Sequence, residues 1–127
     1  MTNYDELHIT PILLIDTTKR DETNIALVKG GTVKSLRKEK RAQELIELID
    51  KLLGSSHLHN KDVRSIAILT GPGSFTGTRI GVVVANTWAW LNHLPIIVIP
   101  GDDFDKAIDD LIKGKDSKVD KVVEATY

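Results

Sequence analysis

A glycine-rich segment in the middle of the chain most constrains how this sequence can fold. Residues 71–81 read Gly-Pro-Gly-Ser-Phe-Thr-Gly-Thr-Arg-Ile-Gly, directly after the short apolar run Ser65–Thr70. An apolar stretch with helical character, Thr78–Asn92, follows at once. Glycines at a strand-to-helix junction permit a tight turn and a close approach of backbone to backbone. The segment therefore predicts a buried strand, a sharp corner and a long helix, which is a building unit of α/β folds.

The apolar periodicity on either side of this corner predicts the remaining elements. Ile12–Ile15 is a continuous apolar run that ends at Asp16, which is typical of a central strand buried on both faces. Two short runs separated by Lys29-Gly30-Gly31 have the composition of a hairpin. The expected strands are 12–15, 23–28, 32–36, 65–70 and 95–100, and the expected helices are 39–53 (ended by Gly54), 78–92 and a third, capped by Asp102 and Asp103, that runs to 113. This order predicts an α/β domain of ribonuclease-H-like plan, with a mixed five-stranded sheet and flanking helices.

Length and composition limit the possible classes of protein. A chain of 127 residues is long enough for one core and short for two. The absence of cysteine excludes disulfides, thiolate catalysis and cysteine-ligated metals. Neither a signal-peptide pattern nor a run of about 18 apolar residues is present, so we expect a cytoplasmic protein without a membrane span. The expected division is a flexible extension at 1–10, a domain at 11–113 and a polar tail at 114–127, with Val119–Tyr127 as a candidate edge strand.

The glycine-rich segment has two chemical interpretations. Backbone donors at a helix N-terminus attract anions, so the segment is a candidate phosphate cradle. Its spacing differs from the common versions, since a dinucleotide fingerprint requires glycine where Thr76 stands and a P-loop requires a lysine that Gly77-Thr78-Arg79 lacks. On spacing alone we favour a structural turn in which Gly77 and Gly81 permit close packing.

The same eleven residues resemble the signature of the TsaB (YeaZ) family, whose members usually carry a bulky apolar residue where this chain has Thr78. Ile12–Thr18 resembles the family's opening strand, Asn24–Val33 its hairpin and Ile66–Leu69 the strand before the signature. The resemblance spans roughly residues 12–104 and implies the actin-like fold of sugar kinases and Hsp70. It assigns the motif loop to Gly71, Pro72, Gly73, Ser74, Phe75, Thr76, Gly77, Arg79 and Gly81.

The resemblance implies a role in tRNA modification. Members of the family lack the metal-binding histidines of their catalytic paralogue TsaD and pair with it. TsaD, with the ATPase TsaE, transfers threonylcarbamoyl to adenosine 37 of certain tRNAs. The implied function is a scaffold and activator with no catalytic residue, metal or cofactor of its own. ATP and metal are then expected on the partner subunits, and tRNA is contacted indirectly.

Two departures from the pattern weigh against independent ATP binding. Family members normally continue into a second domain, so residues 1–127 alone are not expected to form the interdomain nucleotide cleft. Residues 16–19, Asp-Thr-Thr-Lys, also lack the glycine of the first phosphate loop of nucleotide-binding relatives. The alternative function is a small ATP-binding or peptidase-like enzyme that uses Asp16 and the glycine loop. A third interpretation is a self-associating fragment without its second domain.

The first two expected helices are more apolar than one sheet can cover, which indicates a partner. Interfaces favour aromatic anchors beside small residues. We expect helix-to-helix pairing with TsaD, and with a second copy when the chain is alone. The candidate interface residues are Ala42, Ile46, Ile49, Leu53, Val83, Asn86, Thr87 and Trp90. The alternative is that all of them belong to the core.

Charged residues give weaker indications. Asp16, at a strand end, is either a metal or water holder or, as we favour, an acceptor of hydrogen bonds from Thr18 or the glycine loop. His57 and His59 lack a third ligand, and the aspartates of 102–110 lack the glycine of a calcium loop. No metal site is therefore predicted. The basic residues of 34–41 are interpreted as a solvated face, with contact to tRNA as the alternative, and the partner of Arg79 is left open.

Overall fold

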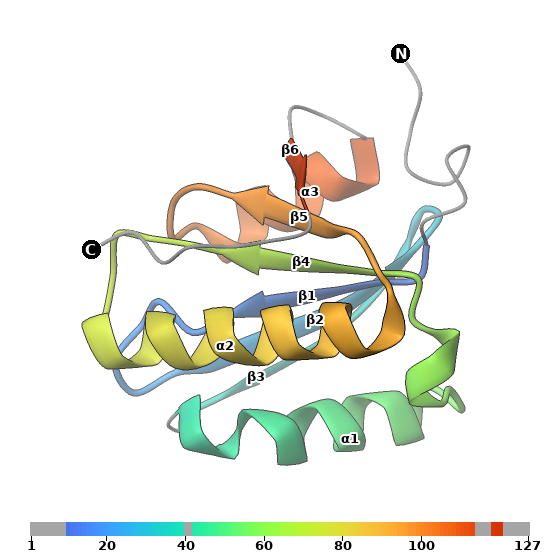
Figure 1. Ribbon diagram of the computed structural model, residues 1–127, viewed down its shortest axis with the longest axis horizontal. Helices are drawn as coiled ribbons and strands as arrows, with labels where there is room; N and C mark the ends of the chain where they lie inside the picture. The colour runs from blue at the N-terminus through green and yellow to red at the C-terminus, as the bar shows by residue number, and fades with distance from the viewer. Residues whose placement is uncertain (1–9, 40–41, 114–117, 121–127) are drawn as a thin grey trace.

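The computed structural model describes residues 10–39, 42–113 and 118–120, which form a six-stranded mixed sheet with helices on both faces (Figure 1). The strand order is β3-β2-β1-β4-β5-β6. The strands are β1 (Ile12–Asp16), β2 (Thr23–Lys29), β3 (Thr32–Lys38), β4 (Ser65–Leu69), β5 (Ile96–Ile99) and β6 (Lys118–Asp120). The helices are the 3₁₀ turns η1 (Ala42–Glu44) and η2 (Asn60–Asp62) and the α-helices α1 (Leu45–Ser55), α2 (Phe75–Asn92) and α3 (Phe104–Lys113).

Strand directions follow the predicted order. β1, β2 and β3 pair antiparallel, whereas β4 and β5 run parallel to β1 and are joined by α2. The sixth strand, β6, pairs antiparallel with β5 and lies in the segment predicted as a polar tail with a candidate edge strand. Residues 1–9 of the predicted extension 1–10, and residues 114–117 and 121–127 of the predicted tail, lie outside the described residues.

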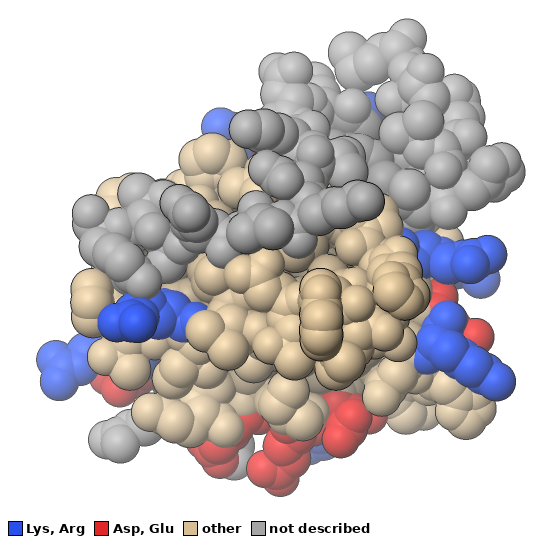
Figure 2. All heavy atoms as spheres, in the orientation of Figure 1, with Lys and Arg blue, Asp and Glu red and all other residues tan. Residues whose placement is uncertain are grey.

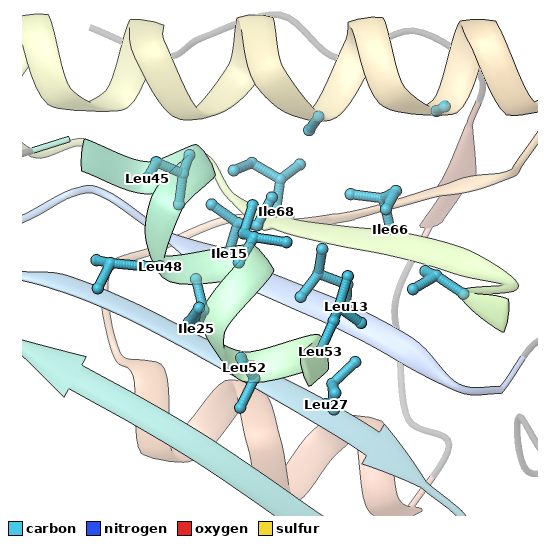
Figure 3. Packing of buried hydrophobic residues seen from close by; sticks show 14 of the residues in the cluster. Leu13, Ile15, Ile25, Leu27, Leu45, Leu48, Leu52, Leu53, Ile66 and Ile68 are labelled. Carbon is cyan, nitrogen blue, oxygen red and sulfur yellow. The ribbon is translucent and has the colours of Figure 1, made fainter. Parts of the chain in front are cut away.

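The central strands are buried on both faces because successive side chains alternate across the sheet. Leu13 and Ile15 of β1 belong to a core with α1 and α2, and Ile12 and Leu14 belong to a second core with α3. Figure 3 shows the first core, in which leucines of α1 lie over isoleucines and leucines of β1, β2 and β4. The sheet thus separates a face covered by α1 and α2 from a face covered by α3.

The predicted bounds of the first helix need correction. The α-helix begins at Leu45, after the turn η1, and it continues through Gly54 to Ser55. The hydroxyls of Ser55 and Ser56 donate to the carbonyl oxygen of Leu52, at 3.0 and 2.9 Å, and complete the last turn. Gly54 does not end the helix because burial of Leu52 and Leu53 outweighs the modest helix cost of one exposed glycine.

The second and third helices begin at polar caps. α2 starts at Phe75, three residues before the predicted start, because the Ser74 hydroxyl accepts a hydrogen bond from the Gly77 amide at 3.3 Å. α3 starts after Asp103, whose carboxylate accepts from the Lys106 amide at 3.0 Å, as predicted for this aspartate. None of the described helices is long and apolar enough to cross a bilayer.

Candidate functional site: the glycine corner and the outer face of two helices

The glycine corner between β4 and α2 is packed directly against the segment that follows β1. The Ser74 amide donates to the carbonyl oxygen of Thr18 at 2.7 Å. A Cβ atom on Gly73 or Gly77 would lie 2.5 Å from the carbonyl oxygens of Thr18 and Thr17, respectively. These distances are shorter than any van der Waals contact, so both positions require glycine. Backbone of Thr17 and Thr18 therefore fills the space beneath these two glycines. The other side of the loop, from Ser74 to Gly77, lines an open depression of about 640 Å³ together with Arg20 and Asp21.

The start of the corner is tied to the turn before α3. Gly71 has a φ of 83°, in the region that favours glycine, and it exchanges two backbone hydrogen bonds of 2.9 Å with Gly101. A Cβ on Gly81, one turn along α2, would overlap the Thr17 hydroxyl. The close packing predicted for Gly77 and Gly81 is therefore present, and it fixes α2 against the ends of β1 and β5.

Thr78, the one departure from the family signature, lies inside this packing. Its side chain is buried, and its hydroxyl oxygen has no hydrogen-bond partner among the described residues. A buried hydroxyl without a partner is less stable than an apolar group of the same shape. The position thus behaves as part of the core, in keeping with the apolar residue usual in the family.

Asp16 is fully buried at the end of β1, and its carboxylate accepts hydrogen bonds from neighbouring residues of the same chain. One carboxylate oxygen, Oδ1, accepts from the backbone amide and the hydroxyl of Thr18, at 2.9 and 2.5 Å. The second, Oδ2, lies 3.4 Å from the side-chain nitrogen of Asn24. The interpretation of Asp16 as an acceptor that orders the next loop is confirmed for Thr18.

A charged contact joins β3 to the start of α3 beside Asp16. The Arg37 guanidinium donates to the Asp105 carboxylate and lies 4.9 Å above the Phe104 ring. The hydrogen bond from Arg37 lowers the pKa of Asp105, and the same bond raises the pKa of Arg37. No local sequence pattern predicts this pair, because it joins residues 68 positions apart.

The predicted basic run is not a continuous free surface. Arg37 pairs with Asp105, and the Lys34 ammonium donates to the carbonyl oxygen of Ser55 at 2.7 Å. Lys40 and Arg41 lie outside the described residues. Arg79 lies over the ring of Phe75, with 5.4 Å between the guanidinium carbon and the ring centroid. His59 contributes to a turn, in which its backbone amide donates to Asp62 at 2.8 Å.

The eight candidate interface residues separate into two groups. Trp90, Val83 and Ile46 expose 77%, 61% and 53% of their surface, and Thr87 is also exposed. Asn86 is half-buried. The other three, Ala42, Ile49 and Leu53, are buried within the described chain and expose little surface to a partner. They face the sheet or α2, which the apolar pattern of α1 alone does not distinguish.

Two of the exposed apolar residues, Ile46 and Val83, border a groove between α1 and α2, whereas Trp90 lies outside its lining. Its volume is about 390 Å³, and it is lined by Ile46, Asp50, Asn60, Val83, Val84, Thr87, Trp88, Leu91 and Asn92. Leu91, exposed at 64%, was missed by the sequence analysis, although it follows Thr87 by one helical turn. Figure 2 shows a broad uncharged surface over α2, with charged side chains at its margins. We call Ile46, Val83, Thr87, Trp90 and Leu91 the α1–α2 face.

The geometry defines an α/β domain of actin-like, ribonuclease-H-like plan whose glycine corner packs directly on the backbone of Thr17 and Thr18. Comparisons with known proteins agree with this class. A family model described as "TsaD: tRNA N6-adenosine threonylcarbamoyltransferase" matches residues 14–101. YeaZ from Pseudomonas aeruginosa, a solved structure, superposes with a TM-score of 0.65 at 28% identity, over 70% of this chain and 43% of that chain.

Two curated relatives carry the name "tRNA threonylcarbamoyladenosine biosynthesis protein TsaB". The Bacillus subtilis protein is 34% identical over 69% of this chain, and the Escherichia coli protein is 35% identical over 68%. This chain covers 40% and 38% of their lengths, respectively. The chain belongs to the TsaB (YeaZ) family, within the larger group that the TsaD model describes.

Proposed function

We propose that the chain is a non-catalytic subunit in the formation of threonylcarbamoyladenosine at position 37 of tRNA, and that it docks on a TsaD-like subunit through the α1–α2 face. The observation that carries the proposal is the exposure of Trp90, Val83 and Leu91 on one face of a helix whose other side already fills the core. Exposed apolar clusters of this kind mark protein interfaces, and tryptophan is enriched among the residues that dominate their affinity.

The packing beneath the glycine corner supports an accessory rather than a catalytic role. Backbone of Thr17 and Thr18 occupies the space beneath Gly73 and Gly77, and Asp16 is engaged by Thr18. ATP and the catalytic metal then belong to the TsaD-like and TsaE-like subunits, and the chain contacts tRNA only through the complex. When the chain is alone, the same face pairs with a second copy, because apolar surface without a partner favours self-association.

Reconstitution tests this role directly. TsaD-like and TsaE-like subunits, a threonylcarbamoyl donor and unmodified tRNA are combined with and without the chain, and modified adenosine is quantified by mass spectrometry. The Val83→Glu variant places a charge in the α1–α2 face, so we expect loss of the stimulation together with loss of binding to the TsaD-like subunit. The matched control is Asp109→Lys, which changes an exposed residue on α3 and is expected to leave both unchanged.

Two results would contradict the proposal. The first is a Val83→Glu variant that no longer binds the TsaD-like subunit but still stimulates tRNA modification fully, because the function would then not require docking. Binding of ATP to the purified chain in calorimetry, or its hydrolysis, would favour the alternative of a small ATP-binding enzyme that uses Asp16 and the glycine loop. A monomer in light scattering at high concentration would contradict only the pairing of the chain with itself.

A further inference from the structure

The groove between α1 and α2 contains a carboxylate that the described fold does not use. Asp50 is exposed, and it is the one charged residue among the described residues that line the groove. It forms no hydrogen bond or ion pair with any described residue, including Lys61, which lines an adjoining depression with it. Glu47, three positions earlier on the same helix, carries the same charge and repels it. Asp50 therefore has no stabilising contact in the described fold.

The walls of the groove suit the stem of one long side chain. Val83, Val84 and Leu91 contribute apolar surface from α2. Trp88 is half-buried and lines the same groove, while its indole nitrogen Nε1 is buried and has no partner among the described residues. The ring therefore presents carbon rather than its hydrogen-bond donor to the groove. The volume of about 390 Å³ exceeds that of any single side chain, so one side chain fits together with water.

The polar atoms at the groove include two acceptors beside the aromatic ring. The Asn92 side-chain nitrogen donates to the carbonyl oxygen of Trp88 at 2.9 Å, which leaves its amide oxygen as an acceptor. The Asp50 carboxylate is the second acceptor. The described lining includes no lysine, arginine or histidine. Figure 2 shows acidic side chains on the α1 side of the uncharged surface. The charge of the groove is therefore complementary to a cation.

Arginine combines the properties that this groove accommodates. Its aliphatic stem covers apolar surface while its charged end reaches polar groups. Its guanidinium packs on tryptophan rings and donates two parallel hydrogen bonds to a carboxylate. Lysine carries the charge but lacks the planar, bidentate donor group. An apolar side chain in the groove would remove water from Asp50 without providing an opposite charge, which is unfavourable.

We propose that an arginine of the TsaD-like subunit inserts between α1 and α2, where Asp50 binds its guanidinium and Trp88 packs against it. The inference rests on the proposed docking function and extends it, because it names the anchoring side chain of the partner. The α1–α2 face then provides apolar contact area, and Asp50 provides specificity. Charged pairs at an interface discriminate between partners more strongly than apolar area does.

The first test measures binding of the full chain to the TsaD-like subunit by calorimetry. Asp50→Asn keeps the size of the side chain and removes its charge, so we expect the Kd to rise by at least about tenfold. The melting temperature should not change, because Asp50 is exposed and unpaired in the described fold. The matched control is Glu47→Gln, which removes the same charge from an exposed residue of α1 outside the groove lining. We expect its Kd to change by less than about twofold.

A double-mutant cycle identifies the arginine on the partner. Each exposed arginine of the TsaD-like subunit is changed to methionine, alone and together with Asp50→Asn in this chain. One of these changes should weaken binding about as much as Asp50→Asn does. Combining that change with Asp50→Asn should weaken binding little further, because both remove the same contact. Raising the salt concentration should weaken binding of the unchanged chain more than that of Asp50→Asn.

Failure of the arginine anchor is distinguishable from failure of docking. If the unchanged chain does not bind the TsaD-like subunit, both proposals are overturned. If it binds, but Asp50→Asn and Glu47→Gln weaken binding equally or no arginine is coupled to Asp50, only the anchor is overturned. If Asp50→Asn weakens self-association and leaves binding to the TsaD-like subunit unchanged, a second copy occupies the groove, which also overturns the anchor.

Discussion

Helices α2 and α3 each follow a parallel strand and cover opposite faces of one sheet, yet they differ in what they present to solvent. α3 buries Phe104, Ala107 and Leu111, and its exposed positions include Asp105 and Lys106. α2 also fills a core, but its outer side exposes a tryptophan, a valine and a leucine. The sheet needs only one apolar side from each helix. The second apolar side of α2 is therefore not buried by the described part of the sheet and its helices.

The two helices also begin differently. α2 begins at a corner where glycines let backbone meet backbone, whereas α3 begins with an aspartate cap and the Arg37–Asp105 ion pair. Backbone packing has no adjustable side chain, so the position of α2 is fixed sterically. An exposed ion pair is weaker and responds to pH and salt. The comparison predicts that α2 is the more precisely positioned helix.

The largest contrast is expected between two aromatic residues. Phe104→Ala in α3 removes a buried ring and is expected to reduce the free energy of unfolding by about 3–5 kcal/mol. Trp90→Ala in α2 is expected to change it by no more than about 0.5 kcal/mol, because the ring is exposed. Urea denaturation of both variants measures the difference. A large loss from Trp90→Ala would show that its face belongs to the fold and would remove the contrast.

The next effect concerns the corner itself. Gly77→Ala drives a methyl group against the Thr17 carbonyl, so we expect a loss of about 1–3 kcal/mol in the free energy of unfolding. Gly54→Ala in α1 is the control, since nothing lies within 4 Å of the added carbon. Gly54→Ala is expected to raise the free energy of unfolding by up to about 1 kcal/mol, because alanine has a higher helix propensity than glycine. The free energies of unfolding are measured by thermal and urea denaturation. Equal changes in the Gly77→Ala and Gly54→Ala variants would contradict the steric explanation.

A smaller gain is expected at Thr78. Thr78→Val keeps the shape of the side chain and removes a buried hydroxyl without a partner, so the free energy of unfolding should rise by about 1 kcal/mol. The exposed neighbour Thr76 serves as the control, and Thr76→Val should be neutral. Equal stability of the Thr78→Val variant and the unchanged chain would mean that the hydroxyl finds a partner in solution.

The smallest effect is expected at the start of α3. The pKa of Asp105 is lowered by Arg37, so its contribution to stability is present above the pKa of an unfolded aspartate and is lost as the pH falls through the lowered value. Asp105→Asn should therefore lower the melting temperature slightly at neutral pH and not at all in strong acid. Melting curves across acid pH test this sign, and a larger difference in acid than at pH 7 would contradict it.

Much of the fold followed from local patterns. The continuous apolar runs correctly predicted the central strands, and the Lys29-Gly30-Gly31 turn predicted the hairpin. Asp103 was correctly predicted as a cap of α3. Errors arose at element ends, where single side chains decide. Because Ser74 caps α2, this helix begins earlier in the chain than predicted. Because Leu52 and Leu53 are packed in the core, α1 continues through Gly54.

The candidate site was predictable only in part. The signature Gly71–Gly81 and the need for glycine at positions 77 and 81 could be read from the chain, as could the surplus of apolar residues on the two long helices. The division of the candidate interface residues into an exposed and a buried group could not be predicted from the chain. Ile46 and Ile49 of α1 are both isoleucines one turn apart, and only the position of the sheet decides that the first is exposed and the second is buried.

The sequence by itself determined the order of the elements and the family, because both depend on short stretches in which composition and spacing carry the information. Tertiary structure decided which apolar residues remained exposed and which polar residues met. The pairs Arg37 with Asp105 and Asp16 with Asn24 join separate elements through strand register and helix placement. Such contacts have no local signature, since the free energy that selects them belongs to the packing of the whole sheet.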